Sequence, residues 1–112
     1  MAHQQFKDCI DACVTCVVAC SHCATECLTQ EHIGHLAKCI QLDLECAAIC
    51  RSAAEVMSLG SGFSAHLCRV CADACNACAQ ECEKHAEMDH CLVCAEACRN
   101  CAKTCEEMAT PV

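Results

Sequence analysis

The chain has 112 residues, of which nineteen are cysteine, two are phenylalanine and none is tyrosine or tryptophan. Its formal net charge is −8, and because it has neither a basic run nor stacking aromatics we expect no nucleic-acid partner. The length suits a single domain over residues 1–112. Since large aliphatic and aromatic residues are scarce, cysteine must fill much of the interior.

The first predicted helix spans residues 4–28 and contains the run CIDACVTCVVACSHCATEC. Its six cysteines follow one another at steps of 4, 3, 4, 3 and 4 residues. Such steps alternate around 3.5 residues, the period that keeps one face of a helix against its neighbours in a bundle. This helix therefore presents a row of thiols: Cys9, Cys13, Cys16, Cys20, Cys23 and Cys27.

The second predicted helix, over residues 32–57, keeps the same register with fewer thiols. Asp43 occupies one of the register positions that cysteine has vacated. On another face Leu42, Ile49 and Val56 recur every seven residues, which predicts an apolar contact between copies of the chain. The thiols of this helix are Cys39, Cys46 and Cys50.

The third and fourth predicted helices, 62–86 and 89–108, carry five cysteines each at steps of 3, 4, 3 and 4 residues. The segments SLGSG and HAEMDH form the turns before them. Short connections place successive helices antiparallel, so the predicted fold class is all-α: an antiparallel up-down-up-down four-helix bundle with a cysteine-lined core. The thiols here are Cys68, Cys71, Cys75, Cys78, Cys82, Cys91, Cys94, Cys98, Cys101 and Cys105.

The start of the chain, MAHQQFKDC, lacks the pattern of a secretory signal, and no run of 18 uncharged apolar residues predicts a membrane span. We therefore expect a cytoplasmic protein with no membrane partner, in a compartment that keeps thiols reduced. The cysteine count is odd, and helix neighbours have Cβ atoms roughly 5–6 Å apart, whereas a disulfide needs roughly 3.5–4.5 Å. Disulfides are therefore not the expected role of these cysteines.

Two other roles of the thiols must be compared. Cysteine could serve only as a small hydrophobic residue, but alanine or valine would fill the same volume without its reactivity. Thiolates also bind soft metals, namely Cu(I), Zn(II) or iron–sulfur clusters. Six CxxC pairs have zinc or cluster spacing, yet each is interleaved with CxxxC on a continuous helix instead of in a loop.

Charge favours Cu(I) among these metals. A Zn(II) ion held by four thiolates has a net charge of −2, and several such sites would bury much unpaired charge. A Cu(I) ion that replaces one thiol proton leaves the charge unchanged, and bridging thiolates bring the ratio close to one ion per cysteine. Two metal–sulfur bonds of about 2.3 Å span about 4–5 Å, the reach between thiols on one helix face. The thiol rows therefore predict a ladder of Cu(I) sites.

The interleaved CxxxCxxC repeats, over residues 4–108, resemble those of the bacterial copper storage proteins, specifically their cytosolic branch. The resemblance implies a helical tube filled with Cu(I), a homotetramer, and storage for copper enzymes or protection from excess copper. It also implies that all nineteen cysteines are ligands. A copper chaperone or a recipient enzyme would be the protein partner, and the sequence identifies neither.

The two ends of the predicted tube differ. One end gathers Phe6, Met57, Ser64 and Met108 and is expected to be an apolar plug. The other end gathers histidines, and the resemblance implies that such an end admits copper. The alternative is that these histidines only cap helices in wet turns. The candidate ligands are the in-register His32 and His85, with His35, Met88 and His90 close by.

Asp43 leaves two interpretations open. The carboxylate either binds copper or hydrogen-bonds a histidine of the mouth, or else it is rotated outward and partly solvated.

The predicted function is cytosolic Cu(I) storage or sequestration without catalysis. The alternatives are a general buffer for zinc and other soft metals, or an iron–sulfur or redox protein. A redox site needs a few privileged cysteines or a cluster loop, whereas this sequence repeats one pattern uniformly. No Ser–His–Asp set, phosphate loop or pair of catalytic carboxylates is evident, so a hydrolytic enzyme is not expected.

Overall fold

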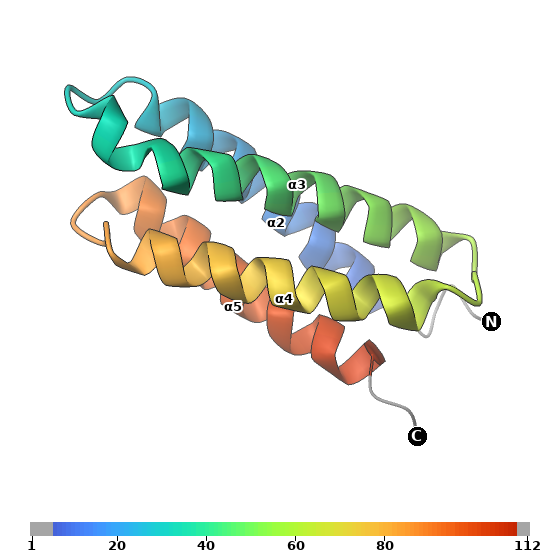
Figure 1. The fold of residues 1–112 in the computed structure, drawn as a ribbon. Helices are drawn as coiled ribbons and strands as arrows, with labels where there is room; N and C mark the ends of the chain where they lie inside the picture. The colour runs from blue at the N-terminus through green and yellow to red at the C-terminus, as the bar shows by residue number, and fades with distance from the viewer. Residues whose placement is uncertain (1–5, 110–112) are drawn as a thin grey trace.

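The computed structural model describes residues 6–109, which form four α-helices and one short 3-10 turn (Figure 1). Each α-helix packs against the two beside it, so that α2 contacts α3 and α5, and α4 contacts the same two helices. The bundle measures 48 × 20 × 18 Å. This confirms the predicted four-helix fold. The elements are α2 (Lys7–Cys27), η1 (Ile33–Leu36), α3 (Ala37–Ser58), α4 (Ser64–Glu83) and α5 (Asp89–Ala109).

The predicted second helix begins later than expected. Residues 33–36 form the 3-10 turn η1, and the α-helix starts at Ala37 instead of residue 32. Gly34 has low helix propensity, and short 3-10 turns commonly lead into α-helices. Leu36, which is buried, anchors the turn on the core. The third helix runs over 64–83 instead of 62–86, and the predicted start of the first helix at residue 4 lies outside the described residues.

The turn between α3 and α4 depends on one glycine. Gly60 has φ = 65°, a left-handed conformation in which a Cβ is unfavourable. Its N–H donates to the carbonyl of Met57, and the N–H of Ser61 donates to the carbonyl of Val56. This pair of bonds is the Schellman arrangement, which satisfies the last carbonyls of a helix. Ser61 Oγ then accepts the N–H of Phe63 at 3.0 Å, which helps α4 to begin.

Cysteine and alanine make up most of the core. All nineteen cysteines are buried, and all are free thiols. Alanines such as Ala53, Ala72 and Ala79 fill positions beside the thiols and are also fully buried. Such small residues let the helices approach closely enough for thiols of different helices to touch. The prediction of a cysteine-lined core is confirmed.

The end of the bundle that holds the α3–α4 turn is apolar. Met57 is completely buried and accepts the thiol of Cys68 at its Sδ, 3.5 Å away. Phe6, Leu67 and Met108 are partly buried against the same cluster. These side chains close the thiol column at this end, as the sequence predicts.

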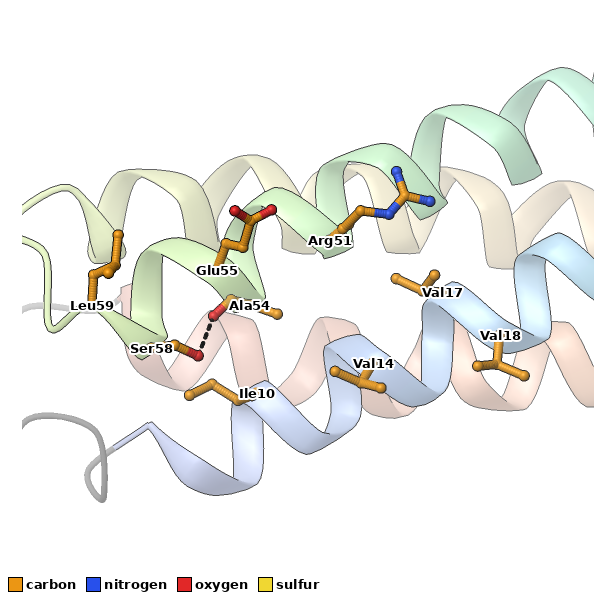
Figure 2. A pocket seen from close by; sticks show the side chains of 9 residues that line it. All are labelled: Ile10, Val14, Val17, Val18, Arg51, Ala54, Glu55, Ser58 and Leu59. Carbon is orange, nitrogen blue, oxygen red and sulfur yellow. Dashed lines mark hydrogen bonds between the residues drawn. The ribbon is translucent and has the colours of Figure 1, made fainter.

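An apolar groove runs along the outside of the bundle between α2 and α3 (Figure 2). Its volume is about 490 Å³. Val14 and Val18 are 51% and 65% exposed there, whereas the predicted contact residues Leu42, Ile49 and Val56 are half-buried within the bundle itself. The groove, and not the predicted face, is thus the more exposed apolar surface. It is lined by Ile10, Val14, Val17, Val18, Arg51, Ala54, Glu55, Ser58 and Leu59.

By length and composition alone, α2 is apolar enough to cross a membrane, with a mean hydropathy of 1.3. Much of that hydropathy comes from the cysteines, which lie in the core of the bundle. A core helix of a bundle meets the same criterion, so this feature is weak support for a membrane span.

Replacement of Met57 by alanine should destabilise the apo protein by about 2–5 kcal/mol, because it leaves a cavity at the apolar end. Leu59→Ala is the matched control. Leu59 is 82% exposed, and its loss should change the free energy of unfolding by less than about 0.5 kcal/mol. Urea unfolding of the reduced proteins under anaerobic conditions measures both values, and equal effects would contradict the described packing.

Candidate metal centre

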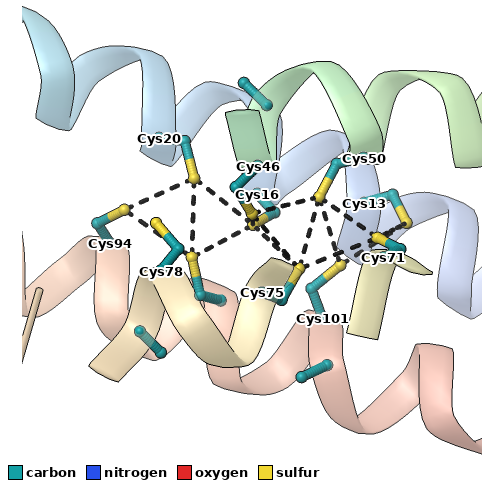
Figure 3. Packing of buried hydrophobic residues seen from close by; sticks show 14 of the residues in the cluster. Cys13, Cys16, Cys20, Cys46, Cys50, Cys71, Cys75, Cys78, Cys94 and Cys101 are labelled. Carbon is teal, nitrogen blue, oxygen red and sulfur yellow. Dashed lines mark hydrogen bonds between the residues drawn. The ribbon is translucent and has the colours of Figure 1, made fainter. Parts of the chain in front are cut away.

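The thiols form one connected column along the axis of the bundle (Figure 3). Cys50 Sγ lies 3.5 Å from Cys71 Sγ and 3.6 Å from Cys75 Sγ, which joins α3 to α4. Cys16 Sγ lies 3.6 Å from Cys98 Sγ, which joins α2 to α5. The 3.5-residue steps keep each row of thiols on the axis over several turns, so these contacts repeat along the column.

Groups of four ligands recur along the column, and neighbouring groups share members. Cys16 and Cys46 both belong to two groups in which every Sγ atom lies within 4.8 Å of the others. Shared thiols suit metals that are bridged by sulfur, whereas isolated four-coordinate sites need separate ligands. The groups include Cys13–Cys71–Cys101–Cys105, Cys16–Cys46–Cys50–Cys75, Cys16–Cys20–Cys46–Cys98, Cys20–Cys78–Cys94–Cys98 and Cys23–Cys27–His90–Cys91.

The spacing of the sulfurs also fits a soft metal. Two metal–sulfur bonds of about 2.3 Å join sulfurs that are up to about 4.6 Å apart. Sulfur pairs 3.5–4.0 Å apart lie within this reach, and all ligand atoms of a group are within 4.8 Å of one another. Neighbouring thiols are therefore close enough to share one ion.

Burial makes charge costly for the thiols near the histidine end. Removal from water is the largest effect on Cys27 and raises its pKa to about 11, and it also raises the pKa of Cys91. Deeper in the column, hydrogen bonds with Cys101 lower the pKa of Cys16 but raise the pKa of Cys13. Hydrogen bonds between neighbouring thiols thus act in opposite directions on different members of the column, whereas burial disfavours charge on all of them. The column favours an uncharged interior.

Asp43 is completely buried among thiols. Its Oδ1 atom accepts hydrogen bonds from Cys78 at 3.2 Å and Cys94 at 3.4 Å, and more weakly from Cys82 at 3.7 Å. Cys39 donates to the other oxygen, Oδ2, at 4.0 Å. Of the interpretations left open, the rotated, partly solvated side chain is wrong, because thiols of α4 and α5 enclose Asp43. Its described partners are thiols and not a histidine of the mouth.

Burial, followed by the proximity of Cys94, raises the pKa of Asp43 from 3.8 to about 8. No cation faces the carboxyl group among these partners, so its neutral form is favoured. Asp43, like the buried thiols around it, is therefore favoured in its uncharged form.

The predicted mouth residues divide between two sites. His90, which lies outside the thiol register, places its Nε2 atom 3.4 Å from Cys27 Sγ and joins the group of Cys23 and Cys91. His85 is buried, and its ring lies edge-on to that of His35 at 5.4 Å.

Four of the five mouth residues line a pocket of about 440 Å³ at this end of the bundle. His32 and His35 are exposed, Met88 is partly buried, and the carboxylates of Glu31 and Glu87 lie at the same pocket. The predicted mouth residues that line it are His32, His35, His85 and Met88.

Sequence reasoning did not select Glu81, which is 7% exposed and pairs with His85. Its position four residues before His85 was the available signal, since residues at that spacing are neighbours on a helix. Burial of the pair could not be read from the spacing alone.

The free energy of unfolding of the apo protein should fall as pH rises from about 4 to about 8, because the folded chain holds the proton of Asp43 after the unfolded chain has released it. Below about pH 4, Asp43 is protonated in both the folded and the unfolded chain, so its full contribution to stability is present. The loss should be up to about 6 kcal/mol. Urea unfolding at several pH values should show a flatter profile for Asp43→Asn, whereas Asp73→Asn, on the exposed side of α4, should keep the wild-type slope.

The chain has clear relatives. The copper storage protein family model matches residues 2–110. The uncharacterized cysteine-rich protein YhjQ of Bacillus subtilis (strain 168) is 48% identical over 88 residues, which cover 79% of this chain and 81% of that protein.

Solved structures agree. The Cu(I)-bound copper storage protein BsCsp3 of Bacillus subtilis is 48% identical, with a TM-score of 0.89 over 94% of this chain and 98% of that one. A cytosolic copper storage protein from Streptomyces lividans, in a copper-loading structure with five coppers, is 38% identical, with a TM-score of 0.93 over 99% of this chain and 97% of that one. The sequence pattern, the thiol-lined bundle and these matches together show that the chain belongs to the copper storage protein family.

Proposed function

We propose that this chain stores or sequesters Cu(I) in the cytosol by binding many ions to the thiolates inside its bundle, as one domain and without catalysis. The observation that carries the proposal is the overlap of the four-thiol groups, in which Cys16 and Cys46 each serve two groups. Overlapping groups suit bridged Cu(I) ions, and the Cu(I)-bound and cytosolic relatives support both the metal and the compartment.

All nineteen cysteines are proposed ligands, and Asp43 is proposed to supply an oxygen where α3 lacks a thiol. Each Cu(I) that replaces a thiol proton leaves the net charge of the column unchanged, so loading does not accumulate charge in a poorly solvated interior.

Copper is proposed to reach the column from the histidine end. The pocket there offers imidazole and thioether donors at His32, His35, His85 and Met88, while His90 already touches Cys27. These donors would pass Cu(I) to stronger thiolate ligands deeper inside. The opposite end is closed by Met57 and its neighbours, which leaves no comparable set of donors among the described residues there.

The competing functions fit the column less well. A zinc buffer would place a net charge of −2 at each separate four-thiolate site, and several such charges would be costly to bury. An iron–sulfur protein is expected to hold its cluster in a loop, whereas the described cysteines lie on continuous α-helices.

Anaerobic titration of the reduced protein with Cu(I), against a strong chelator, should give close to one Cu(I) per cysteine. Native mass spectrometry should show about one proton displaced per Cu(I), because the interior stays neutral. A parallel Zn(II) titration at matched free metal should give far fewer ions. Tight binding of only four or five Zn(II), with weak Cu(I) binding, would instead favour the zinc buffer.

We also propose that the chain assembles as a homotetramer, with the α2–α3 groove occupied by a second copy. Arg51 and Glu55 flank the apolar floor of the groove, so an antiparallel neighbour could pair each with the opposite charge of its own groove.

The double variant Val14→Asp/Val18→Asp should therefore shift the protein from tetramers toward smaller species in light scattering coupled to size-exclusion chromatography. Both side chains are more than half exposed, so the bundle itself should keep its helicity. Val70→Asp, at a 49% exposed position of α4 outside the groove, is the control and should leave the assembly unchanged. An unaltered tetramer in the double variant would place the interface elsewhere.

A further inference from the structure

Two carboxylates within residues 6–109 are buried, and they are held in opposite ways. Asp43 lies among thiols, whereas Glu81, in the last turn of α4, lies between a histidine and a lysine. Glu81 Oε2 is 3.1 Å from His85 Nε2, and its Oε1 is 3.4 Å from Lys84 Nζ. Each oxygen thus has its own partner.

A nitrogen therefore faces each oxygen of Glu81, and one of the two belongs to a positively charged lysine, which is the arrangement that suits a carboxylate. An ionised carboxylate only accepts hydrogen bonds, so the nitrogen of His85 that faces it must carry a proton.

The proton on Nε2 decides what the other side of the ring offers. In a neutral imidazole with its proton on Nε2, the lone pair is on Nδ1. Every fully buried side-chain nitrogen or oxygen among the described residues has a hydrogen-bond partner. The described hydrogen bond of the His85 ring uses Nε2, so Nδ1, which has no such partner, is not fully buried. Nδ1 is therefore open to the pocket that His85 shares with His35 and Met88.

We propose that Glu81 is a positioning residue for copper uptake: it holds the ring proton of His85 on Nε2 and so leaves the lone pair of Nδ1 for a Cu(I) ion in the pocket. A carboxylate behind a histidine fixes the tautomer and orientation of many metal-binding histidines. From this position the ion would pass to Cys39 and Cys82, whose sulfurs are 3.7 Å apart on α3 and α4. The inference rests on the proposed uptake at the histidine end.

A second His–Glu pair shows why burial matters. His22 and Glu26 have the same spacing on α2, but their closest atoms are 3.8 Å apart and their side chains are 62% and 42% exposed. Water competes for both groups there, and exposed pairs of this kind constrain little. The side chains of His85 and Glu81 are 6% and 8% exposed, so the ring has few other partners.

The tautomer of His85 can be read directly in the apo protein by ¹⁵N NMR of the imidazole nitrogens. We expect the Nε2-protonated form in the wild type, a mixture in Glu81→Ala, and partial retention in Glu81→Gln, whose amide oxygen still accepts a hydrogen bond. Glu83→Ala is the matched control: Glu83 is on the same helix but pairs with Arg99, so the tautomer should not change.

The rate of the first phase of Cu(I) uptake is the second readout. Supplied from a weak chelator under anaerobic conditions, Cu(I) should load Glu81→Ala about tenfold or more slowly, with Glu81→Gln between it and the wild type. Glu83→Ala should load at the wild-type rate. Circular dichroism of each apo variant checks that the bundle is intact, and the NMR readout stands even if the uptake of Glu81→Ala is altered by instability.

His85→Ala distinguishes a failure of the proposed uptake through His85 from a failure of the proposed positioning role of Glu81. If His85→Ala takes up Cu(I) at the wild-type rate, the proposed uptake through His85 is wrong. If His85→Ala is slow but Glu81→Ala keeps both the wild-type tautomer and rate, the positioning role is wrong. Slow uptake by Glu81→Ala with an unchanged tautomer would also overturn it, because Glu81 would then act only through its charge.

Discussion

The interior of this bundle is poorly solvated, and this constrains everything placed in it. Nineteen thiols fill the axis, and charge is expensive wherever water is excluded. In the apo column the thiols hydrogen-bond to one another, and burial raises the pKa of Asp43 to about 8, which favours its neutral form. A monovalent ion that replaces a proton meets the constraint as well. The proposed choice of metal thus follows from electrostatics as much as from the softness of sulfur.

The geometry of helices turns this constraint into a column. Steps of three and four residues keep the sulfurs of each helix facing the axis of the bundle, with fewer of them on α3, and alanines beside them allow the four rows to meet. Sulfur contacts of 3.5–4.0 Å therefore recur from the Cys9–Cys105 pair to the Cys27–Cys91 pair. Repetition of one local pattern therefore gives a site with no single centre, in which each group of ligands overlaps the next.

The sequence was sufficient for the features that depend on period. The helices, the inward row of cysteines and the apolar end around Met57 all follow from spacing within one helix. The environment of Asp43 could not be predicted in the same way, because the thiols that enclose it come from α4 and α5 as well as α3. The contact of His90 with Cys27 depends likewise on how the first turn of α5 meets the end of α2. Gly34 is a helix-disfavouring residue and indicates a later start of α3. The heptad-like register continues through it, however, and so predicts helix from residue 32.

The two buried carboxylates show how charge is distributed along the path that copper is proposed to take. Glu81 remains ionised because His85 and Lys84 face it, and Lys84 is open to water. Asp43, farther along the column, has only thiols around it and favours its proton. A cation that enters at the histidine pocket, which Glu31 and Glu87 line, would therefore meet negative charge there and neutral donors inside the column. Such a gradient would draw the ion to the histidine end, and it would leave the exchange of a proton for the ion as the step that admits it to the sulfur column.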